Sequence, residues 1–86
     1  MNLKVFSIYD SKAEAYLPPF HMKSNGEAIR AVTDLVNDAK HNFSKYAQDY
    51  TLFAVGTWDD ATCKYDLYST PMSLGVFLEF KTAVVS

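Results

Sequence analysis

Few residues of this chain could perform catalysis, and the first candidates are one cysteine and two histidines. Cys63 is the single cysteine, and His21 and His41 are the bases that could activate it. A cysteine becomes a nucleophile when a neighbouring base takes its proton. Cys63, however, alternates with Lys64 in a segment typical of a strand, where a cysteine usually serves as a small core residue. We therefore predict that the protein is not an enzyme and has no catalytic residues.

Metal and phosphate sites are not indicated by the sequence either. The two histidines lie twenty residues apart, and no CxxC or HExxH spacing accompanies them. The three glycines are isolated, so no glycine-rich loop could hold a phosphate. Asp59 and Asp60 could form an acid pair or a cation site, but a hairpin turn explains both because aspartate favours turns. We expect no cofactor and no metal.

A nucleic-acid surface is the remaining possibility that the residue types suggest. Such a surface interleaves aromatic rings, on which bases stack, with cations that follow the phosphates. This combination occurs within residues 16–23, near Lys64 and at Lys45-Tyr46. Packing in the core is the alternative explanation for each aromatic side chain. The candidate DNA-contacting residues are Lys4, Tyr16, Phe20, Lys23 and Lys64.

The charge balance argues against strong, non-specific DNA binding. Eight Lys and Arg residues against ten Asp and Glu residues give a net charge of −2, with an isoelectric point near 5.5. The basic residues are spread almost evenly along the chain. Because nucleic-acid-binding domains commonly carry a basic face, any positive patch must be assembled by folding or by dimerisation.

Length and composition indicate one domain spanning residues 1–86. A hydrophobic content of 49% with thirteen aromatic residues is sufficient for a packed core. The single cysteine cannot form an internal disulfide, which fits a reducing compartment. The N-terminal residues lack the apolar region of a signal peptide, and the longest apolar stretch, 74–78, is too short to cross a bilayer. We expect a soluble intracellular protein with no membrane association.

The first part of the chain predicts a strand followed by a rigid turn. Residues 2–9, NLKVFSIY, are rich in β-branched and aromatic types and end at a turn signal. The segment 11–15 is too brief for a stable helix. Pro18 and Pro19 then force an extended path, and residues 20–22 could add a short edge strand. We call the proline pair the elbow.

A single long helix is predicted after the elbow. Ser24 and Glu27 fit a capping box, in which side chains satisfy free amides at the helix start. Apolar residues then recur at spacings of three and four from Ala28 to Ala39. If the role of the elbow is structural and not DNA contact, it sets the angle at which this helix meets a sheet.

The second half of the chain predicts a hairpin and a C-terminal element. Residues 40–48 are expected to form a loop, and 49–58 and 62–68 to form strands joined by a tight turn at 59–61. The segment from residue 70 could form a short helix opened by Pro71 or an extended tail, and the last five residues, TAVVS, could extend a sheet edge. The fold class is therefore α+β: a small antiparallel sheet with one main helix across one face, in the order β-elbow-α-β-β-short α.

Both faces of the predicted sheet are apolar. In the strand 49–58, Leu52, Ala54 and Trp58 alternate with Phe53 and Val55. A half-solvated antiparallel strand should instead alternate between apolar and polar residues. Because the helix covers one face only, we expect the other to be covered by the C-terminal segment, by a second subunit or by stacked nucleic-acid bases.

Four blocks of the sequence resemble a known family. They are VFSIYDSKAEAYLPPF, NGEAIRAVTDLVND, DYTLFAVGTWDD and SLGVFLEFK, which together run from about Leu3 to Lys81. The chain resembles the small nonstructural protein of gokushoviruses, which are single-stranded-DNA phages of the Microviridae. The terminal TAVVS goes beyond the similar segment.

The resemblance implies a nonstructural, DNA-binding phage protein in the host bacterial cytoplasm that aids synthesis or packaging of the single-stranded genome. The resemblance assigns no catalytic or ligand-binding residues to this chain. Our leading hypothesis is a non-enzymatic protein that binds single-stranded DNA weakly or binds a viral or host replication protein. The alternative is a protein-interaction adaptor or assembly factor without nucleic-acid contact, which would form a homodimer or bind a replication or capsid protein.

Overall fold

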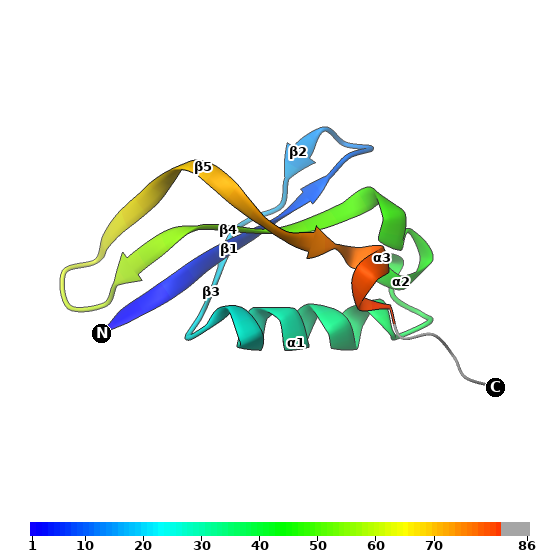
Figure 1. The fold of residues 1–86 in the computed structure, drawn as a ribbon, viewed down its shortest axis with the longest axis horizontal. Helices are drawn as coiled ribbons and strands as arrows, with labels where there is room; N and C mark the ends of the chain where they lie inside the picture. The colour runs from blue at the N-terminus through cyan, green and yellow to red at the C-terminus, as the bar shows by residue number, and fades with distance from the viewer. Residues whose placement is uncertain (82–86) are drawn as a thin grey trace.

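The fold is a curled antiparallel sheet with one long helix lying along one face (Figure 1). A computed structural model describes residues 1–81. The strands are β1 (Asn2–Asp10), β2 (Ala15–Tyr16), β3 (Phe20–Met22), β4 (Tyr50–Asp59) and β5 (Lys64–Val76). The helical segments are α1 (Asn25–Val36), α2 (Asn42–Lys45), the 3-10 turn η1 (Ala47–Asp49) and α3 (Phe77–Phe80). The α+β class is confirmed.

The sheet has the order β2-β1-β4-β5, and β3 pairs with the same edge of β1 as β2. All pairings are antiparallel. β1 and β4 form the centre and pair from Asn2↔Asp59 to Asp10↔Tyr50. β5 is the free edge of the described sheet, and its 13 residues make it the longest strand.

The larger of two irregularities divides the sheet into two halves. Val5 pairs with Gly56 but Phe6 pairs with Ala54, so Val55 is an extra residue in β4. On the other side of β4, Ala54 pairs with Met72 and Gly56 with Leu67. Residues 68–71 of β5 therefore lie opposite Val55 alone. Such bulges bend strands and increase their twist, and β5 arches away at this point (Figure 1).

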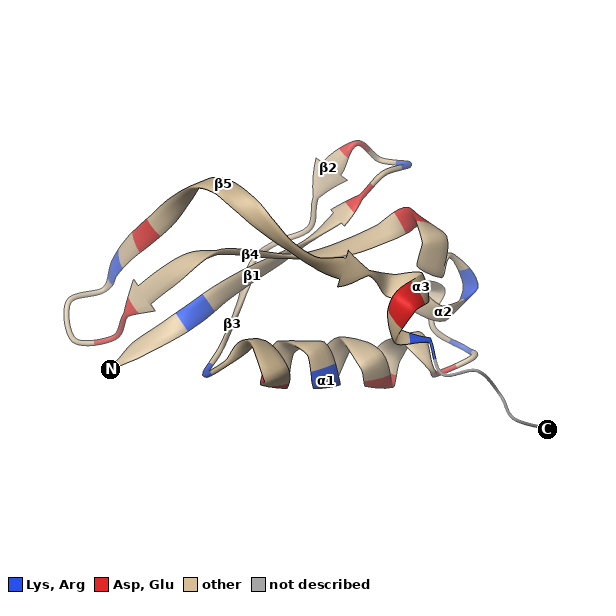
Figure 2. Cartoon of the chain, viewed as in Figure 1, with Lys and Arg blue, Asp and Glu red and all other residues tan. Residues whose placement is uncertain are grey.

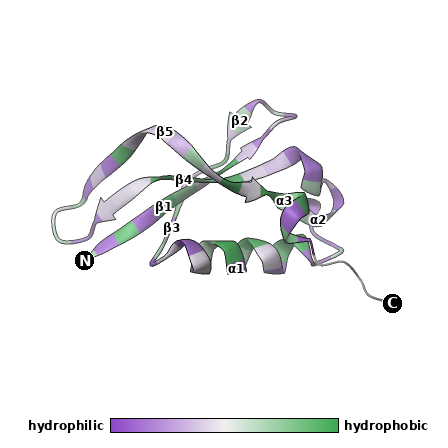
Figure 3. Cartoon of the chain, viewed as in Figure 1, coloured by the Kyte–Doolittle hydropathy of each residue, from purple (hydrophilic) through white to green (hydrophobic). Residues whose placement is uncertain are grey.

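The helix α1 begins where the capping signal predicts. Ser24 is extended, and its side chain accepts a hydrogen bond from the backbone N–H of Glu27 at 3.2 Å. Ala28, Val32 and Val36 are buried and form the apolar stripe. Figure 3 shows hydrophobic residues concentrated on α1 and the middle of the sheet.

The cap supports a first prediction. Ser24→Ala removes the acceptor for a helix-start amide and should lower the free energy of unfolding by about 1 kcal/mol. Urea denaturation would measure this loss. Ser69→Ala, at an exposed site in β5, is the control and should change stability by less than about 0.5 kcal/mol. An equal effect of both substitutions would contradict the role of the cap.

The core lies between the α1 side of the sheet and the helices. Phe6 and Ile8 of β1 and Leu52 and Ala54 of β4 contribute to it, and Phe77 of α3 closes one end. The C-terminal helix α3 therefore packs on the same side as α1 and, within the described residues, does not cover the opposite face of the sheet (Figure 1). The buried apolar residues are Val5, Phe6, Ile8, Ala28, Val32, Val36, Ala47, Leu52, Ala54 and Phe77.

The region predicted as a loop at 40–48 contains helical turns instead. Helix α2 forms because the His41 ring nitrogen Nδ1 accepts a hydrogen bond from the Phe43 backbone N–H at 3.0 Å. The Phe43 ring then packs on Phe77, with ring centres 5.0 Å apart. A long-range aromatic contact thus accompanies a helix too short to be stable alone.

The end of the hairpin also differs from the prediction. β5 does not stop at residue 68 but continues through Pro71 to Val76. An edge strand tolerates proline because the missing N–H would face solvent. The short helix left open by the sequence begins only at Phe77. β2 was not predicted, β3 is confirmed, and TAVVS lies outside the described residues.

Candidate nucleic-acid interface

The face of the sheet opposite α1, here called the outer face, carries the side chains that alternate with the core residues. In β1 these are Leu3, Val5, Ser7 and Tyr9, because Phe6 and Ile8 point into the core. Cross-strand partners share a face. The pairs Leu3↔Trp58 and Ser7↔Phe53 therefore place two aromatic residues of β4 on the outer face.

The position of Trp58 corrects the alternation predicted from the sequence. Simple alternation grouped Trp58 with Leu52 and Ala54, which are core residues. The extra residue Val55 reverses the alternation after it, so Trp58 lies on the same face as Phe53. A bulge depends on the partner strand, and the sequence of β4 alone does not reveal it.

The first aromatic group on the outer face joins His21, Trp58 and Tyr65. The ring centres of His21 and Trp58 are 5.4 Å apart, and those of Trp58 and Tyr65 are 6.4 Å apart. The His21 Nε2 and Tyr65 Oη atoms are hydrogen-bonded at 2.8 Å. Because His21 is on β3 and Tyr65 on β5, this bond spans the two central strands. The two side chains therefore meet above β1 and β4 on the outer face.

The second aromatic group joins Tyr9, Tyr16 and Phe53 in the other half of the sheet. The Tyr16 ring centre lies 4.9 Å from that of Tyr9 and 5.6 Å from that of Phe53. Tyr16 nevertheless keeps 49% of its surface exposed. It is held by its neighbours on one side and open to solvent on the other, as a stacking platform requires.

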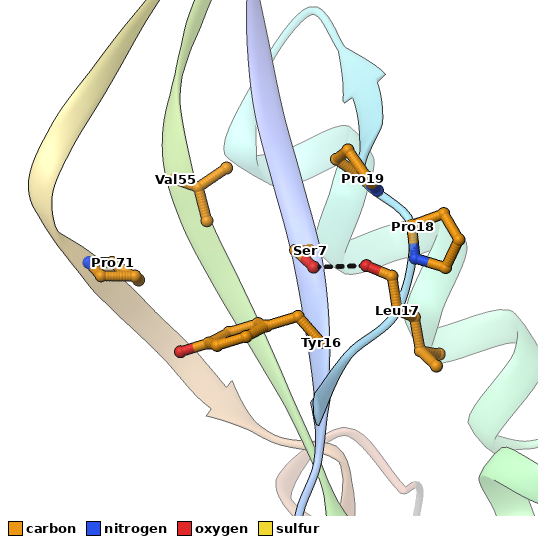
Figure 4. Close-up of a pocket in the computed structure, with 7 residues that line it drawn as sticks. All are labelled: Ser7, Tyr16, Leu17, Pro18, Pro19, Val55 and Pro71. Carbon is orange, nitrogen blue, oxygen red and sulfur yellow. Dashed lines mark hydrogen bonds between the residues drawn. The ribbon is translucent and has the colours of Figure 1, made fainter. Parts of the chain in front are cut away.

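An apolar cleft of about 490 Å³ lies beside Tyr16 (Figure 4). Tyr16 extends from β2 across the outer face, while Pro18 and Pro19 form the opposite wall. Val55 and Pro71 belong to the bulged segments, so the irregularity of the sheet contributes directly to this opening. The lining residues are Ser7, Tyr16, Leu17, Pro18, Pro19, Val55 and Pro71.

Leu17, the residue just before the elbow, is fixed to the sheet by two hydrogen bonds. The Leu17 N–H donates to the Ile8 carbonyl at 2.7 Å, and the buried Ser7 hydroxyl donates to the Leu17 carbonyl at 2.8 Å (Figure 4). The two prolines that follow offer no N–H groups. The elbow therefore both directs the chain toward β3 and α1 and forms a rigid wall of the cleft.

The predicted contact residues do not gather at one place. Tyr16 lies on the outer face, but the Phe20 ring packs 5.7 Å from Phe6 at the edge of the core. Lys4 pairs with Met22 on the α1 side of the sheet, and Lys64 pairs with Asp59 on that same side. Lys23 is exposed just before α1. Of the five predicted residues, Tyr16 is the one placed on the outer face beside the aromatic residues. Trp58, Tyr9 and Phe53 also lie there but were not predicted, because their placement depends on strand register.

The charges at the turns that join the strands are mixed (Figure 2). Lys12 lies at the turn between β1 and β2, close to Asp10, which accepts hydrogen bonds from that turn. At the β4–β5 turn, the Asp59 carboxylate accepts a hydrogen bond from the Ala61 N–H at 2.9 Å. This bond holds the pKa of Asp59 below its usual value. The β4–β5 turn therefore carries a negative charge beside Lys64.

Residues 1–81 contain neither a metal-binding cluster nor a membrane-spanning helix. That part of the chain contains no group of three His, Cys, Asp or Glu side chains arranged to hold a metal ion. None of its helices combines the length and the apolar character that a membrane span requires.

Comparison with known proteins gives one match. No curated protein and no solved structure matches the chain. The family model described as Phage ORF5 protein matches residues 3–80, which is nearly the whole chain. The protein therefore belongs to the Phage ORF5 protein family.

Proposed function

We propose that this phage protein binds single-stranded DNA weakly through its outer face and so supports synthesis or packaging of a single-stranded phage genome. It acts without catalysis, in the cytoplasm of the host bacterium, as expected for a gokushovirus-type nonstructural protein of the Microviridae. The observation that carries the proposal is the pair of partly exposed aromatic groups on the sheet face that no helix within residues 1–81 covers.

Stacking is the interaction that this face offers. Tyr16 and Tyr65 each leave about half of their surface exposed and belong to different aromatic groups. Each ring could receive one unpaired base, and the cleft beside Tyr16 has room for a planar group. Base–aromatic stacking contributes about 1–3 kcal/mol per base and accepts any base. Duplex DNA hides its base faces, so the surface favours single strands.

Electrostatics adds little to this binding. The net charge is −2, and Lys4 and Lys64 lie on the opposite side of the sheet from the rings. On a single strand, each phosphate neutralised contributes about −0.7 to the slope of log affinity against log salt. We expect a slope of about −0.7 to −2, which corresponds to one to three phosphates.

The test is fluorescence anisotropy of a labelled single-stranded oligonucleotide, titrated with the protein at two salt concentrations. Tyr16→Ala should weaken binding about 5- to 100-fold, because it removes one stacking platform. Tyr46→Ala is the matched control, since Tyr46 is 51% exposed but belongs to the α2 end of the molecule. It should leave affinity unchanged, and an excess of duplex DNA should compete poorly.

The opposite results would reject the proposal. Equal losses from Tyr16→Ala and Tyr46→Ala, with both variants folded by circular dichroism, would exclude stacking on the outer face. No binding even at low salt would favour the adaptor function. That alternative rests on a separate observation, the unpaired edge of β5 with its exposed apolar side chains.

A further inference from the structure

The free edge of β5 is unusually apolar for an exposed strand. The other edge of the central pair is occupied by β2 and β3, whereas β5 ends the described sheet. Four of its large side chains are exposed, and Leu67 reaches 63%. Free edges that carry such residues pair readily with other strands unless charges, prolines or bulges block them. The exposed residues are Tyr65, Leu67, Tyr68 and Met72.

Only the first part of this edge is open to pairing. Residues 68–71 are displaced from regular register by the bulge, Leu74 is a further extra residue of β5, and Pro71 has no N–H to donate. These are the features with which proteins protect an edge. The segment from Lys64 to Leu67 has a regular register to β4 and contains no proline. It does carry two exposed charges, Lys64 and Asp66, which oppose pairing with a strand of unmatched charge but favour one of complementary charge.

The charges of this segment are complementary to themselves. In an antiparallel pair related by a two-fold axis at Tyr65, Lys64 of one copy stands opposite Asp66 of the second copy, and the reverse pair forms as well. Opposite charges at facing positions stabilise strand pairs, whereas like charges destabilise them. An axis at Asp66 would instead place the two aspartates against each other. An axis at Leu67 would leave both charges without a charged partner.

We propose that two copies of the protein form a homodimer by pairing their β5 edges antiparallel about Tyr65. Lys64 and Asp66 then form two symmetric ion pairs on the α1 side of the sheet. The two Tyr65 residues face each other at the axis, while each ring stays turned toward His21 of its own copy on the outer face. The two sheets become continuous, and their outer faces lie on the same side. This proposal does not depend on DNA binding, because it rests on the edge and its charges alone.

Exchanging the charges at positions 64 and 66 tests the pairing. The dimer Kd of each variant is measured by sedimentation velocity over a range of protein concentrations. Lys64→Asp and Asp66→Lys each place like charges at both facing positions and should raise the dimer Kd about tenfold or more. The double variant Lys64→Asp/Asp66→Lys restores opposite charges and should return to within about threefold of the original Kd. All of these sites are exposed, and circular dichroism would verify that each variant is folded.

Cross-linking tests the register. In a Cys63→Ser background, Tyr65→Cys places two thiols opposite each other at the axis, where cross-strand Cβ atoms lie within about 4.5–5.5 Å. Mild oxidation should then give a disulfide-linked dimer. Leu67→Cys in the same background is the control and should cross-link little, because position 67 faces position 63 of the second copy.

Three results would overturn the proposal. The protein could stay monomeric at every accessible concentration, the double variant could fail to recover the dimer, or position 67 could cross-link as well as position 65. DNA binding would remain a separate question, because Tyr16 lies outside the β5 edge.

Discussion

Replacing Phe77 with alanine is expected to lower the free energy of unfolding by about 3–5 kcal/mol. The side chain is 0% exposed, and its ring lies 5.0 Å from that of Phe43 and 5.6 Å from that of Tyr50. Removing it leaves a cavity where α2, α3 and β4 meet. A domain of this size is stable by only about 5–10 kcal/mol, so one substitution removes a large part of the total.

Equilibrium urea denaturation, followed by circular dichroism, would measure the effect of Phe77→Ala. The control is the neighbouring Leu78→Ala, because Leu78 is 54% exposed and belongs to the same short helix. It should cost less than about 1 kcal/mol. If Phe77→Ala cost no more than Leu78→Ala, the position of α3 over the core would be wrong.

Replacing Gly56 with alanine is the second substitution with a large expected effect. A methyl group at this position would lie 2.4 Å from the Asp66 carbonyl oxygen and 2.8 Å from the Leu67 Cα atom. Both are backbone atoms of β5, so the strand itself would have to move. Overpacking of this kind costs about 1–3 kcal/mol and occasionally more, and we expect about 3 kcal/mol.

Thermal unfolding of Gly56→Ala and Gly26→Ala provides a matched comparison. A methyl group at Gly26, in the first turn of α1, would meet only the Ser24 Oγ atom at 3.8 Å. Alanine favours the helix there by up to about 1 kcal/mol. The two glycine replacements should therefore change the melting temperature in opposite directions. A stabilising Gly56→Ala would contradict the close approach of β5 to β4.

Local chemistry allowed most of the elements to be predicted. The Ser24 cap and the apolar stripe depend on residues three or four positions apart, so they are visible in the sequence and α1 forms where expected. The alternation of core and outer-face side chains in β1, and the turn at Asp59 and Asp60, likewise depend on residues that are close in the sequence. These features required no knowledge of distant partners.

The features that were missed depend on contacts between distant segments. Val55 is an extra residue only relative to Val5 and Phe6, some fifty positions earlier. That one residue decides which face carries Trp58 and so changes the composition of the candidate site. Phe20 has the residue type of a stacking ring, but its pairing with Phe6 places it at the core. Sequence reasoning found the aromatic residues and could not assign their faces.

The displaced segment 68–71 has a consequence for variation in chain length. Because these four residues oppose Val55 alone, the strand parts on either side keep their own registers to β4. Adding or removing a residue here would leave both registers intact, whereas the same change elsewhere in the sheet would turn the following side chains to the opposite face. We therefore expect a one-residue insertion or deletion at this point to preserve the fold, and a short peptide tag to be tolerated there.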